Sequence, residues 1–273
     1  MSKAKKRDIP VYQQAIIETH CHLDYLDNAQ LDEELRAART VGVERIITIA
    51  VSPDNLSVVR RLAETKPAVY CTQGIHPHEA EKYAAEVRDE IRSHTSHAEV
   101  VAIGEIGLDY FYDHADRRVQ REVFASQLQI AADADMPVVI HSRDADDDMQ
   151  TILADFLPIL NKRGVIHSFS SGMALAEFAI SHGFYLGYNG MVTFNKADNV
   201  REAVTATPLG QLILETDSPY LTPVPYRGRS NAPRFIPFVA EKIAELKSLP
   251  VEELLRHCYT NSETLFFTRG THA

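Results

Sequence analysis

The stretch Val138-Val139-Ile140-His141 decides the fold, because it is a short β-branched run that ends in a metal-binding side chain. Four other apolar runs are followed in the same way by histidines or a carboxylate. The six side chains placed like this are His20, His22, Glu105, His141, His167 and Asp217. Active-site groups of a (β/α) barrel lie at the C-terminal ends of its strands. The pattern therefore predicts a catalytic metal centre at the mouth of a barrel.

Strand-like and helix-like runs alternate along the chain without a linker rich in proline, glycine or serine. The runs typical of strands cover 15–18, 45–50, 68–73, 99–103, 137–141, 164–167, 184–189 and 211–216. Amphipathic segments typical of helices lie near 30–41, 54–65, 79–94, 116–135, 145–160, 172–182, 196–206 and 232–246, with a last helix near 251–267. Strands that are each followed by a helix indicate an α/β protein.

These elements predict a single-domain (β/α)8 TIM barrel over residues 15–273, preceded by a flexible N-terminal extension, residues 1–14. An open doubly wound sheet is the alternative, but such a sheet gathers its site at one switch point. The candidate ligands instead follow the first, fourth, fifth, sixth and eighth predicted strands, which suits a ring.

Composition limits the partners. The 273 residues carry a formal charge of −10, so the field of the whole molecule does not attract nucleic acid, and a polyanionic substrate must be held by local cations or bound metal. The three cysteines have no CxxC spacing, which argues against a disulfide framework or a thiolate zinc site and favours a reducing compartment. No signal peptide or membrane-spanning segment is expected. We expect a cytoplasmic protein, compatible with a monomer, without a membrane partner.

Four imidazoles and two carboxylates gathered at one barrel mouth would be costly to bury without a partner, and divalent metal supplies that partner. Six ligands exceed the needs of one tetrahedral ion, so two ions are expected, with Glu105 as the bridging carboxylate. A nitrogen and oxygen ligand set suits zinc, manganese or iron, and magnesium with water ligands. Bound metal would activate a water molecule, and Asp217 would bind one ion and orient or deprotonate that water.

Each of the further residues expected at the barrel mouth has two possible roles. His76 and His78 follow the third predicted strand and would contact substrate or orient metal ligands. Arg143 would pair with a phosphate oxygen or with the aspartates beside it. Those acids, Asp144 and residues 146–148, are interpreted as first-turn residues favoured by the helix dipole rather than as a second metal site.

Residues 222–237 contain three arginines, Arg227, Arg229 and Arg234, and no acid. Placed after the last strand, they would form a small positive lip that positions a phosphodiester, or a solvated loop without a role. Tyr226 or Tyr110 would offer a stacking face for an unpaired base.

The chain resembles the TatD family of metal-dependent deoxyribonucleases, among the amidohydrolase-like barrels, from about Ile16 to Phe266. The motifs that carry the resemblance are His20-Cys-His-Leu-Asp24, Gly74-Ile-His-Pro-His78, Ile103-Gly-Glu-Ile-Gly-Leu-Asp-Tyr110, Pro137-Val-Val-Ile-His-Ser-Arg-Asp144, His167-Ser-Phe-Ser170, Glu215-Thr-Asp-Ser-Pro-Tyr-Leu221 and Arg227-Gly-Arg-Ser-Asn231. Several of these motifs are long, so chance similarity is a poor explanation.

The resemblance implies one metal held by His20, His22 and Asp217, a second held by His141 and His167, and Glu105 as the bridge. It places His76 near the substrate phosphate. The implied activity is phosphodiester hydrolysis, with trimming of single-stranded DNA from the 3′ end. The chain departs from the family pattern at Ser168, where cysteine is usual, in the Ser170-Ser171-Gly172 turn, and at Ala232, where glutamate is common. These changes concern the substrate groove and leave the metal set intact.

Two other functions compete with a nuclease. A hydrolase of a small ester, lactone or amide would use the same centre, since an activated water attacks carbonyl carbon as well as phosphorus. A structural metal site in an interaction protein is the second rival. Structural zinc sites are usually closed, four-coordinate and rich in cysteine, which the thiolate-free set of six does not match.

Overall fold

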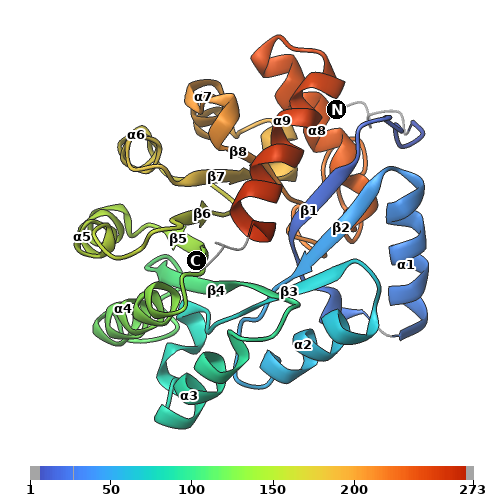
Figure 1. The fold of residues 1–273 in the computed structure, drawn as a ribbon. Helices are drawn as coiled ribbons and strands as arrows, with labels where there is room; N and C mark the ends of the chain where they lie inside the picture. Colours follow the sequence, from blue (N-terminus) through green and yellow to red (C-terminus); the bar gives the residue numbers. More distant parts are fainter. Residues whose placement is uncertain (1–6, 27, 269–273) are drawn as a thin grey trace.

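The computed structural model describes residues 7–26 and 28–268, and its strands form one parallel sheet in the order of the chain. The strands are β1 (Ile16–Cys21), β2 (Val43–Thr48), β3 (Val69–Gln73), β4 (Val100–Asp109), β5 (Val138–Arg143), β6 (Gly164–Ile166), β7 (Tyr185–Tyr188) and β8 (Leu212–Leu214). The last strand, β8, lies beside β1 (Figure 1), and Ser218, which follows β8, forms an isolated parallel bridge with Cys21 at the end of β1. This confirms the predicted (β/α)8 barrel.

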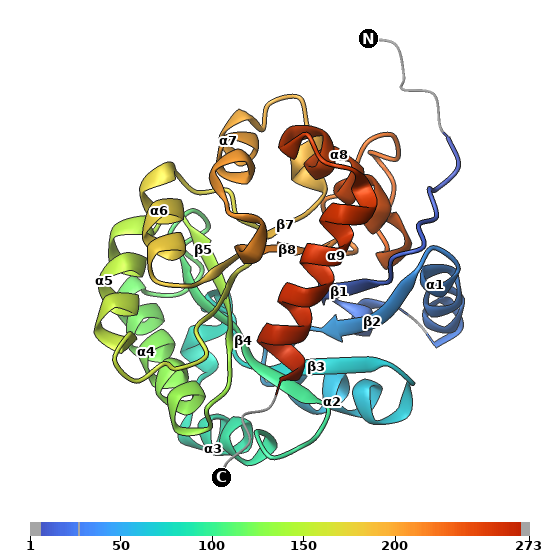
Figure 2. The same cartoon turned by 45° about the horizontal axis from the view of Figure 1, so that its top comes forward.

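In Figures 1 and 2 most helices surround the ring of strands, and the last helix runs across in front of the strands. The helices are α1 (Asn28–Thr40), α2 (Leu56–Thr65), α3 (Ala85–His94), α4 (Arg117–Asp133), α5 (Asp146–Phe156), α6 (Met173–Ser181), α7 (Asp198–Ala206), α8 (Ile236–Lys247) and α9 (Val251–Ser262). The segment predicted as one helix over 79–94 is divided into a 3-10 turn, Pro77–Lys82, and α3. None of the described helices is both long and apolar enough to span a bilayer.

The interior of the barrel is apolar at the end where the strands begin. Its side chains come from the second residue of several strands, including Val101, Val139 and Val165. Leu265 and Phe266, which follow α9, pack against them and close this end. Because this end is plugged, the polar chemistry is confined to the opposite end of the barrel.

The strand β4 runs to Asp109, six residues beyond its predicted end at 103, and its pairing with β5 shifts register between Ile103 and Ile106. Such a bulge re-aims a side chain, and here Glu105 lies inside the strand rather than after it. The neighbouring glycine is required, because a Cβ on Gly104 would lie 2.6 Å from the Cβ of Val139. The two glycines of this motif lower strand propensity, so the run looks shorter in the sequence than it is.

Residues 7–14 pack along the last two helices before β1 begins. The Tyr12 hydroxyl donates to Glu241 of α8 at 2.9 Å, and Arg7 forms an ion pair with the same carboxylate. The backbone amides of Gln13 and Gln14 donate to Glu252 of α9. Four of these residues therefore have hydrogen-bond or ion-pair partners on the barrel, whereas residues 1–6 lie outside the described part, where the expected flexible extension stays a prediction.

Candidate metal centre

Glu105 lies at the centre of a group of buried imidazoles at the open end of the barrel. Its Oε1 is 2.7 Å from His167 Nε2 and 3.1 Å from His141 Nδ1, and its Oε2 is 3.4 Å from His20 Nε2. Only 3% of Glu105 is exposed. Residues that are 36 to 85 positions apart in the chain thus meet around one carboxylate, because β1, β4, β5 and β6 direct them to the same end.

Asp217 stands at the rim of this group, three residues after the end of β8. Its Oδ1 lies 3.5 Å from His22 Nε2 and 3.8 Å from His20 Nε2, so the two histidines of the His20-Cys21-His22 motif face the same carboxylate. Cys21 between them is fully buried in the core, as the alternation of a strand predicts. The backbone amide of Asp217 donates to the carbonyl of His20 at 2.9 Å, which ties the β8 loop to β1.

Ligand atoms within 4.8 Å of one another form three overlapping groups in the described chain. The groups are His20, His22 and Asp217; His20, Glu105 and His167; and His76, Glu105 and His141. Glu105 and His20 each belong to two groups, so they link the three. This is the arrangement expected of residues that share closely spaced cations.

The site has unused hydrogen-bonding atoms. Within the described residues, both ring nitrogens of His20, Nδ1 of His22 and Nδ1 of His167 are buried without a hydrogen-bond partner. An unpartnered buried polar atom is costly, and a divalent cation would coordinate imidazole nitrogen that has no other partner. The donor set, imidazole nitrogen with carboxylate oxygen and no thiolate, also fits a catalytic divalent ion. The residues present therefore fit a metal centre.

The charges of the cluster are coupled. Burial favours the neutral acid of Glu105, but His167 and His76 outweigh burial and hold the pKa of Glu105 well below its usual value. Burial also disfavours the imidazolium of His167, yet the Glu105 carboxylate raises the pKa of His167 well above its usual value. In the absence of bound cations, the carboxylate and a proton on His167 therefore stabilise each other.

Two buried carboxylates support the histidines from behind. Asp109 Oδ2 lies 2.9 Å from His141 Nε2 and 3.0 Å from His78 Nε2. Glu215 Oε1 lies 3.6 Å from His167 Nδ1 and accepts hydrogen bonds from the Ser168 amide and the Asn189 side chain. Carboxylates in such positions orient metal-binding imidazoles. The residue pattern did not single out either acid, although both lie within motifs quoted above, next to predicted ligands.

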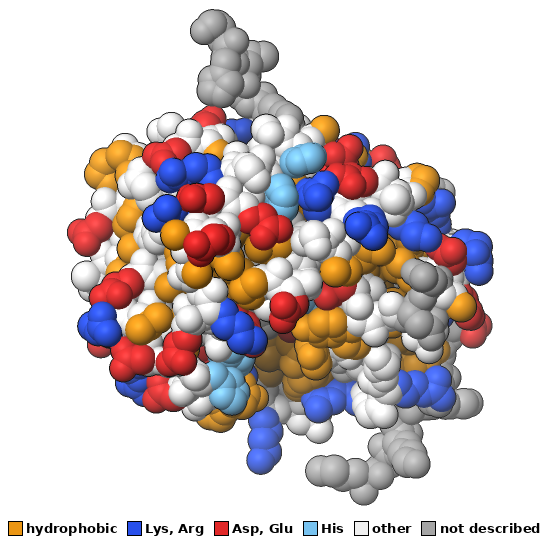
Figure 3. Space-filling model, turned by 90° about the horizontal axis from the view of Figure 1, so that it is seen from below, with side chains coloured by type: hydrophobic (Ala, Val, Ile, Leu, Met, Phe, Trp, Pro, Cys, Tyr) orange, Lys and Arg blue, Asp and Glu red, His pale blue; other side chains and the backbone are white. Residues whose placement is uncertain are grey.

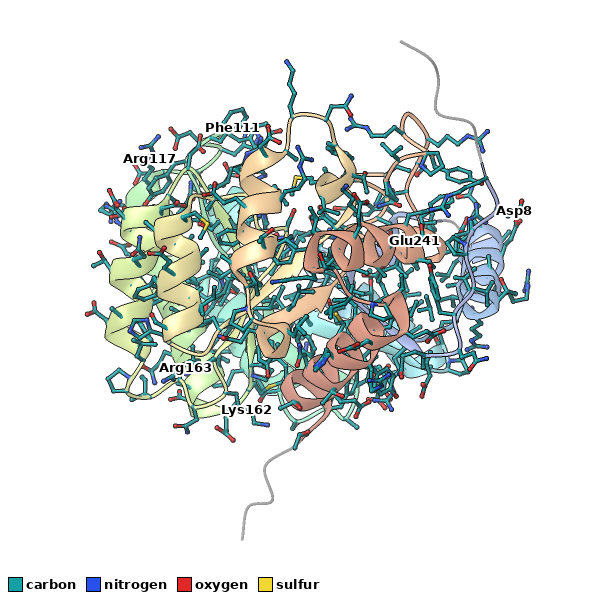
Figure 4. The ribbon with its side chains drawn as sticks, turned by 90° about the horizontal axis from the view of Figure 1, so that it is seen from above. Asp8, Phe111, Arg117, Lys162, Arg163 and Glu241 are labelled. Carbon is teal, nitrogen blue, oxygen red and sulfur yellow. The ribbon has the colours of Figure 1, made fainter. Side chains whose placement is uncertain are left out.

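The open end of the barrel is hollowed into a cavity of about 1350 Å³. Glu105, Asp217 and five histidines line its floor and walls, together with loops that follow β4, β5 and β6. Phe111, in the loop after β4, lies at this end, whereas Lys162 and Arg163 lie at the other (Figure 4). The cluster is therefore open to a substrate.

A family model described as "TatD related DNase" matches residues 17–267. The chain belongs to the TatD family. It is 35% identical over 252 residues to the uncharacterized metal-dependent hydrolase YabD of Bacillus subtilis (strain 168), covering 92% of this chain and 98% of that protein. It is 36% identical over 256 residues to the uncharacterized metal-dependent hydrolase YcfH of Escherichia coli (strain K12), with 92% and 95% covered. The crystal structure of the TatD homologue YjjV from Escherichia coli K12 superposes with a TM-score of 0.88 at 32% identity, covering 93% and 98%. The chain is thus a member of a metal-dependent hydrolase family.

In this TatD-family protein His76 lies beside Glu105, within the group of candidate ligands, and not only at the substrate side of the cavity. Its Nε2 is 3.4 Å from Glu105 Oε1, and the amide of His78 donates to its Nδ1 at 3.2 Å. Burial and the neighbouring His141 lower the pKa of His76 to about 4 despite the Glu105 carboxylate. A neutral imidazole beside Glu105 can accept a proton or bind a cation, so its expected contact with a phosphate stays a prediction.

Arg143 is exposed at the mouth and makes no ion pair with the aspartates that follow it, as far as the chain is described. Its guanidinium lies 4.2 Å from the ring centre of Phe111 and 5.0 Å from that of Tyr112. Asp148, in the first turn of α5, instead accepts from the Tyr110 hydroxyl at 2.5 Å and from Arg121 at 3.1 Å. This favours the first-turn interpretation of the acids and leaves Arg143 free for a substrate anion.

The predicted stacking by Tyr226 or Tyr110 stays a prediction, and both rings already have neighbours in the structure. The ring of Tyr226 packs 4.7 Å from Phe235 and 5.5 Å from Phe238, so neighbouring aromatics occupy it, and Arg117 covers the ring of Tyr110 at 4.4 Å. These partners come from other segments of the chain, so they could not be predicted from the position of a tyrosine in a loop.

The arginines of residues 222–237 do not line the described part of the cavity. Arg234 pairs with Glu34 at 3.2 Å, and Arg227 lies over Phe194 at 3.6 Å. The expected positive lip is therefore not part of the cavity wall, because its charges have local partners. Of the departures from the family pattern, Ser168 lines the cavity and accepts a hydrogen bond from Asn189 at 2.9 Å, while Ala232 is buried beside Phe235.

Proposed function

We propose that this protein is a metal-dependent phosphodiester hydrolase, a TatD-type deoxyribonuclease that trims single-stranded DNA from the 3′ end. The observation that carries the proposal is the cluster of imidazoles around Glu105 at the floor of an open cavity of about 1350 Å³. Small-molecule pockets usually occupy roughly 300–1000 Å³, so this cavity has room for more than one nucleotide. The exposed guanidinium of Arg143 supplies a cation at the rim.

We infer that two divalent ions, of magnesium, manganese or zinc, occupy the site. His20, His22 and Asp217 would hold one, His141 and His167 the other, and Glu105 would lie between them. When bound, such ions lower the pKa of a water molecule towards neutrality and neutralise charge on the phosphate.

The remaining chemistry belongs to the side chains of this chain. Asp217, which is near the rim and beside His22, would take the proton of the attacking water. Arg143 would hold a non-bridging phosphate oxygen. His78 Nε2 lies 3.0 Å from Asp109 Oδ2, and His78 lines the cavity, so it is in a position to protonate the leaving oxygen.

The test is hydrolysis by metal-stripped protein that is re-supplied with magnesium, manganese or zinc. We expect a 5′-labelled single-stranded oligonucleotide to shorten step by step from its 3′ end, and only after metal is added. A Glu105→Gln variant purified in the same way controls for contaminating nucleases. Turnover of lactones or amides without turnover of the oligonucleotide would refute the nuclease.

The second candidate, hydrolysis of a small ester, lactone or amide, is favoured by the acidity of the cavity. Glu79 and four aspartates of the β5 loop and first turn of α5 line it: Asp144, Asp146, Asp147 and Asp148. Such a lining suits an uncharged or cationic substrate better than a long polyanion. The same panel of substrates separates the two functions.

We also propose that the protein works in the cytoplasm as a monomer. Cys21, Cys71 and Cys258 are all free and buried, which agrees with a reducing compartment.

A further inference from the structure

Two pairs of exposed aromatic side chains rise from opposite sides of the cavity mouth. Tyr25 follows β1 and Tyr220 follows β8, which are neighbours in the ring, whereas Phe111 and Tyr112 follow β4 across the barrel. All four line the cavity, and they are 49%, 53%, 54% and 50% exposed. Single exposed aromatics are common, but paired rings on both sides of a candidate active site indicate a binding surface.

The Tyr25–Tyr220 platform is tied to the metal cluster. The Tyr25 ring stacks on the imidazole of His22 at 5.1 Å and 12°, and its centre is 6.3 Å from that of Tyr220. Each tyrosine stands three residues after a candidate ligand in a tight turn: its amide donates to the carbonyl of His22 or Asp217. These contacts place two aromatic rings at a set position relative to the cluster.

The Phe111–Tyr112 platform is tied to the other side of the cluster. Asp109 Oδ1 accepts from the amides of both residues, at 3.1 and 2.9 Å, while its Oδ2 holds His141. The Tyr112 ring stacks on His114 at 5.7 Å, and Arg143 lies over both platform rings. One buried carboxylate therefore positions a candidate ligand and an aromatic platform together.

Charge gives little support to a long phosphate backbone at this mouth. Arg143 is the one lysine or arginine in the cavity lining that the structure describes, and acids outnumber it. The flank of the barrel seen in Figure 3 also mixes acidic and basic side chains, and the blue residues there form no continuous basic band. Recognition by stacking does not need such a band, because every base has an aromatic face.

We propose that the two platforms bind the nucleobases on either side of the scissile phosphate, one base on each platform. This deepens the proposed nuclease function and rests on it. The substrate is then an unpaired strand end whose last two bases are separated from each other, which paired bases in a duplex cannot be. Binding is independent of base identity and depends weakly on salt, since stacking rather than phosphate contacts supplies most of it.

The experiment is a cycle of three substrates and several proteins. One oligonucleotide carries normal terminal and penultimate nucleotides, the second carries an abasic analogue only at the terminal place, and the third carries one only at the penultimate place. In the unmodified protein, loss of each base should lower kcat/KM about 5- to 150-fold. In the double variant Tyr25→Ala/Tyr220→Ala, or Phe111→Ala/Tyr112→Ala, one of these losses should disappear. The variant Tyr220→Phe keeps the aromatic ring, so it should show the same loss on base removal as the unmodified protein. Tyr259→Ala changes an aromatic residue on α9, at the closed end, and serves as the matched control.

A second measurement uses unmodified protein. The logarithm of kcat/KM should fall against the logarithm of salt concentration with a slope near −0.7, as for about one phosphate contact to a single strand. Equal losses on base removal in the platform variants and the unmodified protein would overturn the inference, and so would a slope of −3 or steeper. Failure of the unmodified protein to cleave any of the oligonucleotides would instead refute the nuclease proposal itself.

Discussion

Replacing Glu215 with glutamine should weaken metal binding without disturbing the fold. Glu215 is fully buried, and its Oε1 accepts from the Ser168 amide at 2.7 Å and from Asn189 at 3.1 Å. The oxygen of a glutamine side chain can still accept these bonds. The change therefore removes mainly the negative charge 3.6 Å from His167 Nδ1.

The structure sets the size of the effect. A full positive charge at 3.6 Å from the carboxylate would interact with it by about 4–5 kcal/mol at an effective dielectric constant near 20. A neutral imidazole bound to a cation carries only part of that charge, so the effect must be smaller. Loss of an outer partner of a metal-binding histidine typically lowers metal affinity about 10–100-fold, or roughly 1.4–2.8 kcal/mol. We expect Glu215→Gln to fall in this interval.

Glu18 offers a matched control. It is equally buried, and its Oε1 accepts from the amides of His20 and Thr216, but it has no contact with the imidazole of a candidate ligand. Burial raises the pKa of Glu18 to about 8, so at neutral pH it is largely the uncharged acid, which glutamine imitates. Glu18→Gln should therefore leave metal affinity within about twofold of the unmodified protein.

The assay is competition for zinc or manganese against a chromophoric chelator, with thermal unfolding as a check on folding. An unchanged affinity in Glu215→Gln would refute the role given to this carboxylate. An equal loss in both variants would show that any change of a buried acid beneath the cluster disturbs it.

Three further outcomes are expected. Glu105→Gln should lower metal affinity and hydrolysis by more than the roughly 10–100-fold effect of an outer partner, because Glu105 contacts the histidines directly; an active variant in either assay contradicts its central place. Burial opposes protonation of His22, His141 and His167, but the carboxylates of Asp217, Asp109 and Glu105 raise the pKa values of these histidines. Because protons then compete with metal for the imidazoles, metal affinity should rise from pH 6 to pH 8 in calorimetric titrations. An affinity that does not change with pH would contradict this. Metal at about 100 times its Kd should raise Tm by about 5–10 °C over chelated protein in differential scanning fluorimetry, and equal Tm values would argue against a preformed site.

The barrel and its ligand-bearing strands were predictable because the signals are local. Val138-Val139-Ile140 is a buried strand by composition alone, and His141 follows it directly. The end of β4 was missed for a reason that is not local. Gly104 and Gly107 look like a break in a strand, yet a Cβ on Gly107 would lie 2.0 Å from the carbonyl oxygen of His141, so close approach of β5 requires glycine there.

The supporting acids and the aromatic platforms depend on contacts between distant segments. Asp109 and His141 are 32 residues apart, and only the pairing of β4 with β5 brings them together. Tyr25 and Tyr220 become neighbours when β1 meets β8. Conversely, Tyr226 is of a residue type that can stack on a base, but its ring packs against Phe235 and Phe238.

The sequence by itself determined the type of barrel and the kind of metal ligands, since hydrophobic periodicity and a histidine or acid at the end of a run are properties of neighbouring residues. The sequence also indicated Glu105 as the carboxylate between the ligands. Only the tertiary structure decided which acids hold the imidazoles and which aromatic rings face the cavity. Those outcomes depend on strand register and on the closure of the ring, which pair residues that no local pattern relates.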